Sequence, residues 1–442
     1  MAPGALLTDL YELNMAASYL LRGMLREATF SLFVRRLPKD RGFLVAAGLE
    51  PALEFLTGFR FTDDDLAYLR DELHFQADVL DAFAALRFEG DVWAMPEGRI
   101  VFSDEPLLEI TAPMPIAQLV EPYLLNILTF QTTIASKAAR CVLAARGREL
   151  IDFSLRRTQG LEAALAVART TALVGFRATS NVEGAHRYGL TPSGTMAHSY
   201  IESFPTELEA FTTFATDRPG PVTFLVDTYD VRAGVDAAIA AIRRLGLVDG
   251  LGVRIDSGDL DRLSRETRRQ LDAAGLPHVR IVASGGLDDV SVARLVEAEA
   301  PIDAFGVGTR MGVSADAPYL DSAYKLVEYD GMPMLKLSSG KVTYPGRKQV
   351  FRGPSGDILA LREERAPAGY AALLEPMIRG GERVGRAGTL REARERFHAD
   401  LGRLPMDARR IEEPIAPVPA ISDALADLTE RASADARRRA GV

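Results

Sequence analysis

The stretch Leu251-Gly252-Val253-Arg254-Ile255-Asp256-Ser257-Gly258-Asp259 decides the fold. A short, mostly apolar strand pattern ends here in an acidic turn with a glycine, and a helical pattern follows over residues 260–274. The same order of strand, polar turn and helix surrounds it, with strand 222–226 ending at Asp227 and strand 279–283 ending at Ser284. Asp227, Asp256 and Ser284 are 29 and 28 residues apart, so each spacing spans one βα unit.

Two further strands of this kind, residues 149–153 and 302–305, frame the series. Apolar strands joined by helices predict a parallel sheet, and this many units in a row favour a barrel over an open sheet. In a barrel the strand ends open onto one face, so side chains far apart in sequence converge there. Glycines at strand ends also serve as plain turn formers, and that alternative remains.

The rest of the chain differs in pattern. Residues 1–115 mix helices with short strands and predict an α+β domain, completed by a return segment at 325–352. Residues 116–324 are assigned to a distorted βα-barrel domain. Residues 325–442 hold the return segment and a C-terminal region that we expect to be helical. The predicted fold class is therefore α/β, with an irregular (β/α) barrel, an N-terminal α+β domain and a helical C-terminal extension.

The composition is that of a globular protein, with 47% hydrophobic and 26% charged residues. A net charge of −9 gives no electrostatic footprint for nucleic acid. The single cysteine, Cys141, excludes an internal disulfide and a multi-cysteine metal site. No apolar run is long enough to span a membrane, and the start lacks a signal-peptide layout, so we expect a cytoplasmic protein.

Two consecutive strand ends carry glycine turns suited to phosphate. Ser284-Gly285-Gly286 and Gly306-Val307-Gly308-Thr309 offer backbone N–H groups and hydroxyls close to helix starts. Barrels often bind a phosphate at their last two strands. Together with the acids and Arg254 at earlier strand ends, they indicate a phosphorylated sugar as ligand.

A histidine lies in the turn-rich stretch Pro192-Ser193-Gly194-Thr195-Met196-Ala197-His198-Ser199-Tyr200. A lone histidine is more often structural than catalytic. His198 gains weight as a functional candidate because the acidic strand ends follow it in the same part of the chain.

Four motifs, in order over about residues 6–352, resemble the nicotinate phosphoribosyltransferase family. They are Thr8-Asp9-Leu10-Tyr11, Gly194-Thr195-Met196-Ala197-His198, Arg254-Ile255-Asp256-Ser257-Gly258-Asp259-Leu260 and the turn at residues 306–309. Each is unspecific alone, but the combination is highly specific. The resemblance implies a barrel of the type II phosphoribosyltransferase kind and a homodimer with shared active sites.

The resemblance also implies the reaction. Nicotinate condenses with 5-phosphoribosyl 1-diphosphate (PRPP) to give nicotinate mononucleotide and diphosphate, while ATP is hydrolysed. Asp227 and Asp256 would stabilise positive charge on the ribose ring. Arg254 and Thr195 would hold the nicotinate carboxylate, since a planar guanidinium binds carboxylates in bidentate fashion. Tyr11, reaching in from the neighbouring subunit, would cover the pyridine ring.

By the same resemblance, His198 is the histidine that ATP phosphorylates, and this phosphorylation would reorganise the pocket. Four of the six lysines fall within residues 325–348. From this basic segment we expect contacts to diphosphate or ATP by Lys341, Arg347 and Lys348. Two arginines after strand 149–153, Arg156 and Arg157, are expected to add to them. The alternative is that the basic segment is a solvated hairpin. Mg²⁺ is expected with the diphosphate, but the sequence names no protein ligand for it.

Other functions remain as alternatives. A nicotinamide phosphoribosyltransferase would need an acceptor for the amide near Thr195, and Thr195-Met196 supplies none. A quinolinate phosphoribosyltransferase would need more cations for its dicarboxylate. A non-catalytic nucleotide-binding sensor would have no need of a phosphorylatable histidine. A Schiff-base aldolase is disfavoured because no lysine lies between Lys137 and Lys325.

Overall fold

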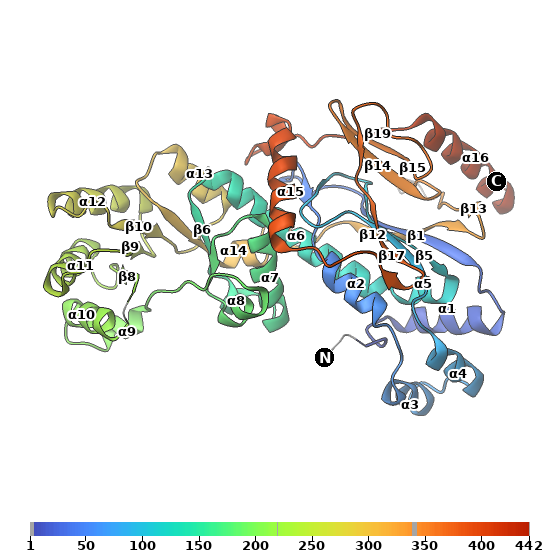
Figure 1. Cartoon of the computed structure of the whole chain (residues 1–442), viewed down its shortest axis with the longest axis horizontal. Coiled ribbons are helices and arrows are strands. Elements are labelled where there is room, and N and C mark those ends of the chain that lie inside the picture. Colours follow the sequence, from blue (N-terminus) through green and yellow to red (C-terminus); the bar gives the residue numbers. More distant parts are fainter. Residues whose placement is uncertain (1–3, 219, 338–342, 442) are drawn as a thin grey trace. The chain divides into compact units, whose positions relative to one another are not determined.

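The computed structural model describes residues 4–218, 220–337 and 343–441. The chain folds as two compact units, unit 1 (Met1–Thr133, Tyr319–Arg410 and Pro414–Val442) and unit 2 (Ile134–Pro318 with Ile411–Glu413). The return segment therefore belongs to unit 1. Figure 1 labels the elements of both units along the chain. The described residues contain no helix long and apolar enough to cross a membrane.

Unit 1 is built on a seven-stranded antiparallel sheet. Its strands, in spatial order, are β13 (Met332–Pro333), β12 (Ser322–Tyr329), β1 (Glu27–Val34), β5 (Pro106–Pro113), β3 (Asp91–Ala94), β17 (Glu375–Arg379) and β18 (Glu382–Arg383). A two-stranded sheet of β2 (Leu44–Val45) and β4 (Ile100–Val101) accompanies it. The helices are α1 (Leu10–Leu21), α2 (Leu49–Thr57), α3 (Asp63–Asp71), α4 (Ala77–Ala85) and α5 (Met114–Leu119). The long helix α6 (Glu121–Ala145) supplies residues to both units.

Strand alternation gives the large sheet one apolar and one polar face. Phe30 lies opposite Ile110 in the pairing of β1 with β5, and its ring stacks on Tyr324 with centroids 4.7 Å apart. These side chains are buried in the main core. Neighbouring residues point to the other face, where Ser31 lies opposite both Glu109 and Lys325. A buried polar face needs partners from another element.

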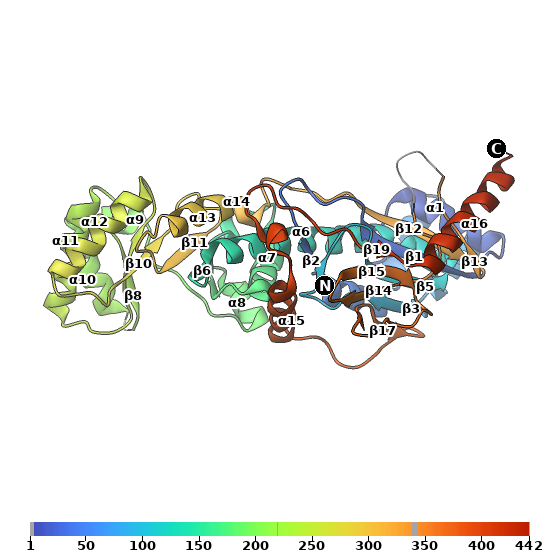
Figure 2. The same cartoon turned by 90° about the horizontal axis from the view of Figure 1, so that it is seen from above.

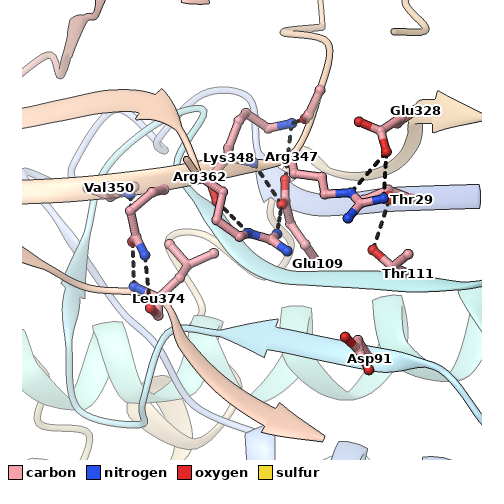
Figure 3. A network of polar contacts seen from close by, with 12 residues as sticks. Thr29, Asp91, Glu109, Thr111, Glu328, Arg347, Lys348, Val350, Arg362 and Leu374 are labelled. Carbon is pink, nitrogen blue, oxygen red and sulfur yellow. Dashed lines mark hydrogen bonds and ion pairs between the residues drawn. The ribbon is translucent and has the colours of Figure 1, made fainter. Parts of the chain in front are cut away.

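Those partners come from a four-stranded sheet of β16 (Ala371–Ala372), β14 (Lys348–Gly353), β15 (Gly356–Leu361) and β19 (Ala420–Ile421). Lys348 Nζ lies 3.0 Å from Glu109 Oε1, and Arg362 forms an ion pair with the same carboxylate. Arg347 Nη2 lies 2.7 Å from Glu328 Oε1. Figure 3 shows this network, which we call the charged layer of unit 1 and define by these five residues.

The C-terminal region is less helical than its sequence indicates. Besides α15 (Leu390–Arg403), the short helix η2 (Met406–Arg409) and α16 (Asp423–Ala440), it contributes strands β15 to β19. The hairpin of β14 and β15 forms because Val350 and Phe351 pair with Leu359 and Ile358 around a tight turn. Gly356 allows this turn with φ of 105°.

Unit 2 contains the predicted parallel sheet. Its order is β7 (Ala178–Thr179), β6 (Glu149–Asp152), β11 (Ala304–Val307), β10 (Arg280–Ala283), β9 (Leu251–Ile255) and β8 (Val222–Leu225), with every pair parallel. The alternation of strand and helix read from the sequence is confirmed. No pairing joins β7 to β8 within the described residues, so the sheet is open at both edges. Its assignment to an irregular barrel remains a prediction.

Helices follow the strands of unit 2. They are η1 (Leu155–Arg157), α7 (Leu161–Val174), α8 (Val182–Tyr188), α9 (His198–Glu202), α10 (Glu207–Asp217), α11 (Val231–Leu245), α12 (Leu260–Ala273), α13 (Asp289–Glu297) and α14 (Thr309–Gly312). Figure 1 shows α10, α11 and α12 on the same side of β8 and β9, and Figure 2 shows the same three helices beside β8. Because the strands are parallel, their carboxyl ends lie at one edge of the sheet, where the polar side chains gather.

Candidate active site

Three of the predicted residues form a continuous hydrogen-bonded row. Leu225 pairs with Arg254 and Ile255 pairs with Ala283, so Asp227, Asp256 and Ser284 come level just beyond the strand ends. Asp227 Oδ2 accepts a hydrogen bond from the backbone N–H of Asp256 at 3.0 Å. Asp256 Oδ1 in turn accepts one from Ser284 Oγ at 2.5 Å. The equal βα spacing in the sequence corresponds to this row across β8, β9 and β10.

The two carboxylate oxygens of Asp227 differ in their hydrogen bonding. Ser257 Oγ also donates to Asp227 Oδ2, at 2.6 Å, so this oxygen has two donors. Asp227 Oδ1 is buried and has no hydrogen-bond partner among the described residues. A buried carboxylate oxygen without a donor is costly, and such an atom indicates a position kept for a ligand or cation.

Arg254 shows the same pattern with the opposite charge. Its Nη1 donates to Thr195 Oγ1 at 2.6 Å, and its Nη2 lies 3.4 Å from the carbonyl oxygen of Met196. Its Nε is buried and has no partner in the described part of the chain. Burial lowers the pKa of the guanidinium, and the nearby Asp256 and Asp227 act in the opposite direction. The structure brings Arg254 and Thr195 together, with the Nε–H edge of the guanidinium unused.

Phe153 also belongs to this site, although it was not predicted as a site residue. Its ring centroid lies 6.0 Å from the guanidinium carbon of Arg254, within range of a cation–π interaction. It follows the end of β6 directly, so its position after a strand was the only signal available in the sequence. An aromatic ring beside an arginine favours a planar, negatively charged ligand.

His198 is half-buried at the first position of α9. Its Nδ1 lies 3.1 Å from Thr228 Oγ1, in the turn after β8. This contact links the histidine to the turn that carries Asp227. The structure therefore places His198, which is distant in sequence, against the residue that follows Asp227.

The two glycine turns differ in structure. Gly285 and Gly286 both have left-handed backbones, with φ of 92° and 70°. A side chain at Gly285 would lie 1.7 Å from the carbonyl oxygen of Asp256, whereas Gly286 has open space around it. Gly308 and the exposed Thr309 begin α14, but Gly306 is buried inside β11. Only the first turn and residues 308–309 retain the features expected of an anion site.

Arg156 and Arg157 lie exposed on η1. Neither guanidinium group forms a hydrogen bond or ion pair with another described residue, whereas the backbone N–H of Arg157 donates to the carbonyl oxygen of Ser154 at 2.7 Å. The turn beneath them is fixed by the buried Asp152, which accepts hydrogen bonds from Ser154 N at 2.9 Å and Thr179 Oγ1 at 2.7 Å. Burial raises the pKa of Asp152, and these hydrogen bonds oppose the shift. Two unpaired cations on an anchored turn are available to an anion.

The remaining candidates belong to unit 1. Tyr11 is 53% exposed on α1. Arg347 and Lys348 lie in the charged layer, where Lys348 is 2% exposed and its ammonium is held by Glu109. Burial lowers the pKa of Lys348, against the effect of Glu109. Its ammonium therefore has no free position for a phosphate, and Lys341 lies outside the described residues.

Known families match both units. The model described as nicotinate phosphoribosyltransferase N-terminal domain matches residues 6–129, and that of the nicotinate phosphoribosyltransferase family matches residues 148–338. Nicotinate phosphoribosyltransferase pncB2 of Mycobacterium tuberculosis is 48% identical, covering 93% of this chain and 89% of its own. Nicotinate phosphoribosyltransferase of Bacillus subtilis is 42% identical, and the match covers 81% of this chain and 76% of the relative. The crystal structure of human nicotinic acid phosphoribosyltransferase superposes with a TM-score of 0.84 at 30% identity. The superposition covers 96% of this chain and 99% of the human chain. The chain belongs to the nicotinate phosphoribosyltransferase family.

Proposed function

We propose that this protein transfers the phosphoribosyl group of PRPP to nicotinate, forming nicotinate mononucleotide and diphosphate for NAD biosynthesis. The observation that carries this proposal is the unused Nε–H edge of Arg254, buried beside Thr195 and Phe153. An aromatic carboxylate fits this edge, because a carboxylate accepts two parallel hydrogen bonds from a guanidinium.

The carboxylate row supports the chemical step. The pyridine nitrogen uses its lone pair to bond to the anomeric carbon, and the bond from that carbon to the diphosphate oxygen breaks. Positive charge develops on the ribose during this exchange, and Asp227 and Asp256 supply negative charge next to it. Both are held by short hydrogen bonds, so they need no rearrangement as the charge develops.

The phosphates are assigned to the cationic and glycine turns of unit 2. We infer contacts from Arg156 and Arg157 and from the backbone at Gly285, Gly286 and residues 308–309. Mg²⁺ would neutralise the diphosphate, and the bare Oδ1 of Asp227 fits it as a ligand. The described residues contain no group of three or more His, Cys, Asp or Glu side chains that could hold a metal ion. The proposal leaves the other ligands of the ion to phosphate oxygens and water.

ATP coupling is assigned to His198. Its imidazole would attack the γ-phosphorus of ATP, forming a nitrogen–phosphorus bond as ADP leaves with the electrons of the broken bond. The contact with Thr228 would hold the ring in position for this attack. Phosphorylation adds negative charge next to the carboxylate row, which would change the affinity for the anionic substrates.

The proposal includes a homodimer and a type II barrel. The exposed side of α1 and its flanks carries Leu7, Leu10, Tyr11, Leu21 and Leu25, each more than half exposed. A second copy of the chain would cover these side chains and bring Tyr11 to the partner's nicotinate site. Mixing inactive Tyr11→Ala and Arg254→Ala proteins should then restore part of the activity; no recovery would argue against shared sites.

One assay tests the function directly. Product formation is measured with nicotinate, nicotinamide and quinolinate, each with and without ATP, and we expect product from nicotinate, increased by ATP. Labelled ATP should give an acid-labile phosphate that is absent in His198→Ala. Lack of product with nicotinate would refute the transferase assignment, and equal labelling of His198→Ala would refute the phosphohistidine alone.

A further inference from the structure

Gly306 lies inside the sheet at a place where no side chain fits. It belongs to β11, between β6 and β10, and it is fully buried. A Cβ atom here would lie 2.5 Å from Cδ2 and Cε2 of the Phe153 ring and 3.1 Å from Cβ of Ser284. The ring of Phe153 therefore occupies the space that any other residue would fill.

This close approach sets where the Phe153 ring can go. Asp152 pairs with Val307, so Phe153 starts level with Gly308 and its ring leans back over Gly306. Arg254 is on β9, three strands away from β6, which is about 14 Å at roughly 4.8 Å per strand. The ring centroid and the guanidinium carbon are still only 6.0 Å apart, and the ring gains part of this reach by packing over Gly306, where β11 carries no side chain.

Gly306 differs in its position from the glycines of the proposed phosphate turns. Its strand pairs with a neighbour on each edge, whereas Gly286 and Gly308 lie beyond strand ends. The glycine at 306 is thus explained by the aromatic ring packed on it. A phosphate contact is not needed to account for it.

We propose that Gly306 is a positioning residue for nicotinate recognition: it seats the Phe153 ring beside Arg254, so that both together receive the aromatic carboxylate. This inference rests on the proposed function. It predicts that the main effect of Gly306 is on the nicotinate site through Phe153, and that any effect on PRPP through the looser contact with Ser284 is smaller.

The experiment is a double-mutant cycle with kinetics for both substrates. Wild type, Gly306→Ala, Phe153→Leu and the double variant are compared for the KM of nicotinate and of PRPP. Relieving the 2.5 Å contact moves the ring by about 1 Å, for which we expect a 10- to 100-fold rise in nicotinate KM with Gly306→Ala. The PRPP KM should stay within about twofold, and the double variant should resemble Phe153→Leu alone, since the two changes share one contact.

Gly286→Ala is the matched comparison, because Gly286 has open space around it and lies in a proposed phosphate turn. It should raise the PRPP KM and leave the nicotinate KM nearly unchanged. Thermal melting checks folding; if Gly306→Ala does not fold, folding of the double variant would itself support the contact with Phe153.

A rise in the PRPP KM as large as that in the nicotinate KM with Gly306→Ala, or losses in the double variant equal to the product of the single losses, would overturn the inference. If Gly306→Ala does not fold, a double variant that also fails to fold would overturn it too. Wild type that makes no nicotinate mononucleotide would instead refute the proposed function, and this result is read before any variant is compared.

Discussion

Two clusters of buried charge in this protein are built in opposite ways. In the charged layer of unit 1, Glu109 is enclosed by two cations, Lys348 and Arg362. Glu109 Oε1 lacks a hydrogen bond of good geometry but lies 3.0 Å from Lys348 Nζ. In unit 2, Asp227 Oδ1 and Arg254 Nε are buried with no hydrogen-bond partner among the described residues, and neither side chain has an ion pair there. Desolvated charges are stable only when they are compensated, so the first arrangement maintains the fold. The second leaves an energetic deficit that a bound ligand can remove.

The largest loss of stability is expected in the charged layer. Glu109→Gln removes the carboxylate that compensates two buried cations, and we expect the free energy of unfolding to fall by about 3–5 kcal/mol. Urea denaturation measures it. Glu328→Gln is the matched control, because its partner Arg347 is 34% exposed and the loss should be about 1 kcal/mol or less.

The layer would prove functional if Glu109→Gln kept its stability and lost kcat. In that case the pairing of Lys348 would not be purely structural, and its predicted contact with phosphate would return.

In unit 2 we expect a substitution in the carboxylate row to affect activity and not stability. Asp227→Asn removes the bare charge while keeping its shape, and kcat/KM should fall about 10²- to 10³-fold, as for other residues that stabilise developing charge. Stability should stay about the same, because an asparagine carbonyl oxygen can still accept the hydrogen bonds from Asp256 N and Ser257 Oγ. Asp230→Asn is the matched control: Asp230 accepts a hydrogen bond from Ala233 N at 2.9 Å as the cap of α11, and asparagine caps equally well.

A large loss of stability in Asp227→Asn, with activity reduced only in proportion, would remove the distinction between the two clusters. Equal losses in both Asp variants would do the same, because Asp230 lies in the same turn but outside the carboxylate row.

The sequence revealed the second cluster better than the first. Asp227, Asp256 and Ser284 were predictable because apolar strands of similar length end at each of them, and parallel strands bring such ends together. The role of Lys348 was hidden, because a lysine in a basic segment gives no local sign that Glu109, far away in the chain, encloses it. The contact of Phe153 with Gly306 likewise depends on strand order, which no local pattern specifies.

Unit 1 also holds carboxylates that do not follow its paired pattern. Glu12, on α1 next to Tyr11, is buried, and neither of its carboxylate oxygens has a hydrogen bond of good geometry within the described ranges. Near it, Glu121 Oε2 accepts a hydrogen bond from Gln118 at 3.0 Å. Burial, opposed by Lys325 and reinforced by Glu12, raises the pKa of Glu121 to about 7. Both acids lie near the exposed Tyr11. Because burial disfavours a charged carboxylate that has no cation bound to it, we expect their charged forms to lower the stability of the fold.

Glu121→Gln provides the smallest and most specific test. A carboxyl with a raised folded-state pKa binds more protons folded than unfolded, so its charged form costs stability that grows from about pH 4.5 and is complete above about pH 7. The variant should therefore be more stable than wild type by about 1 kcal/mol at pH 8, after allowance for solvent screening, and equal to it at pH 4. Urea denaturation at both pH values measures the difference, with Glu54→Gln, an exposed carboxylate on α2, as control. The same gain at pH 4 and pH 8 would show that packing, and not charge, distinguishes Glu121, and the cost assigned to its buried charge would then be wrong.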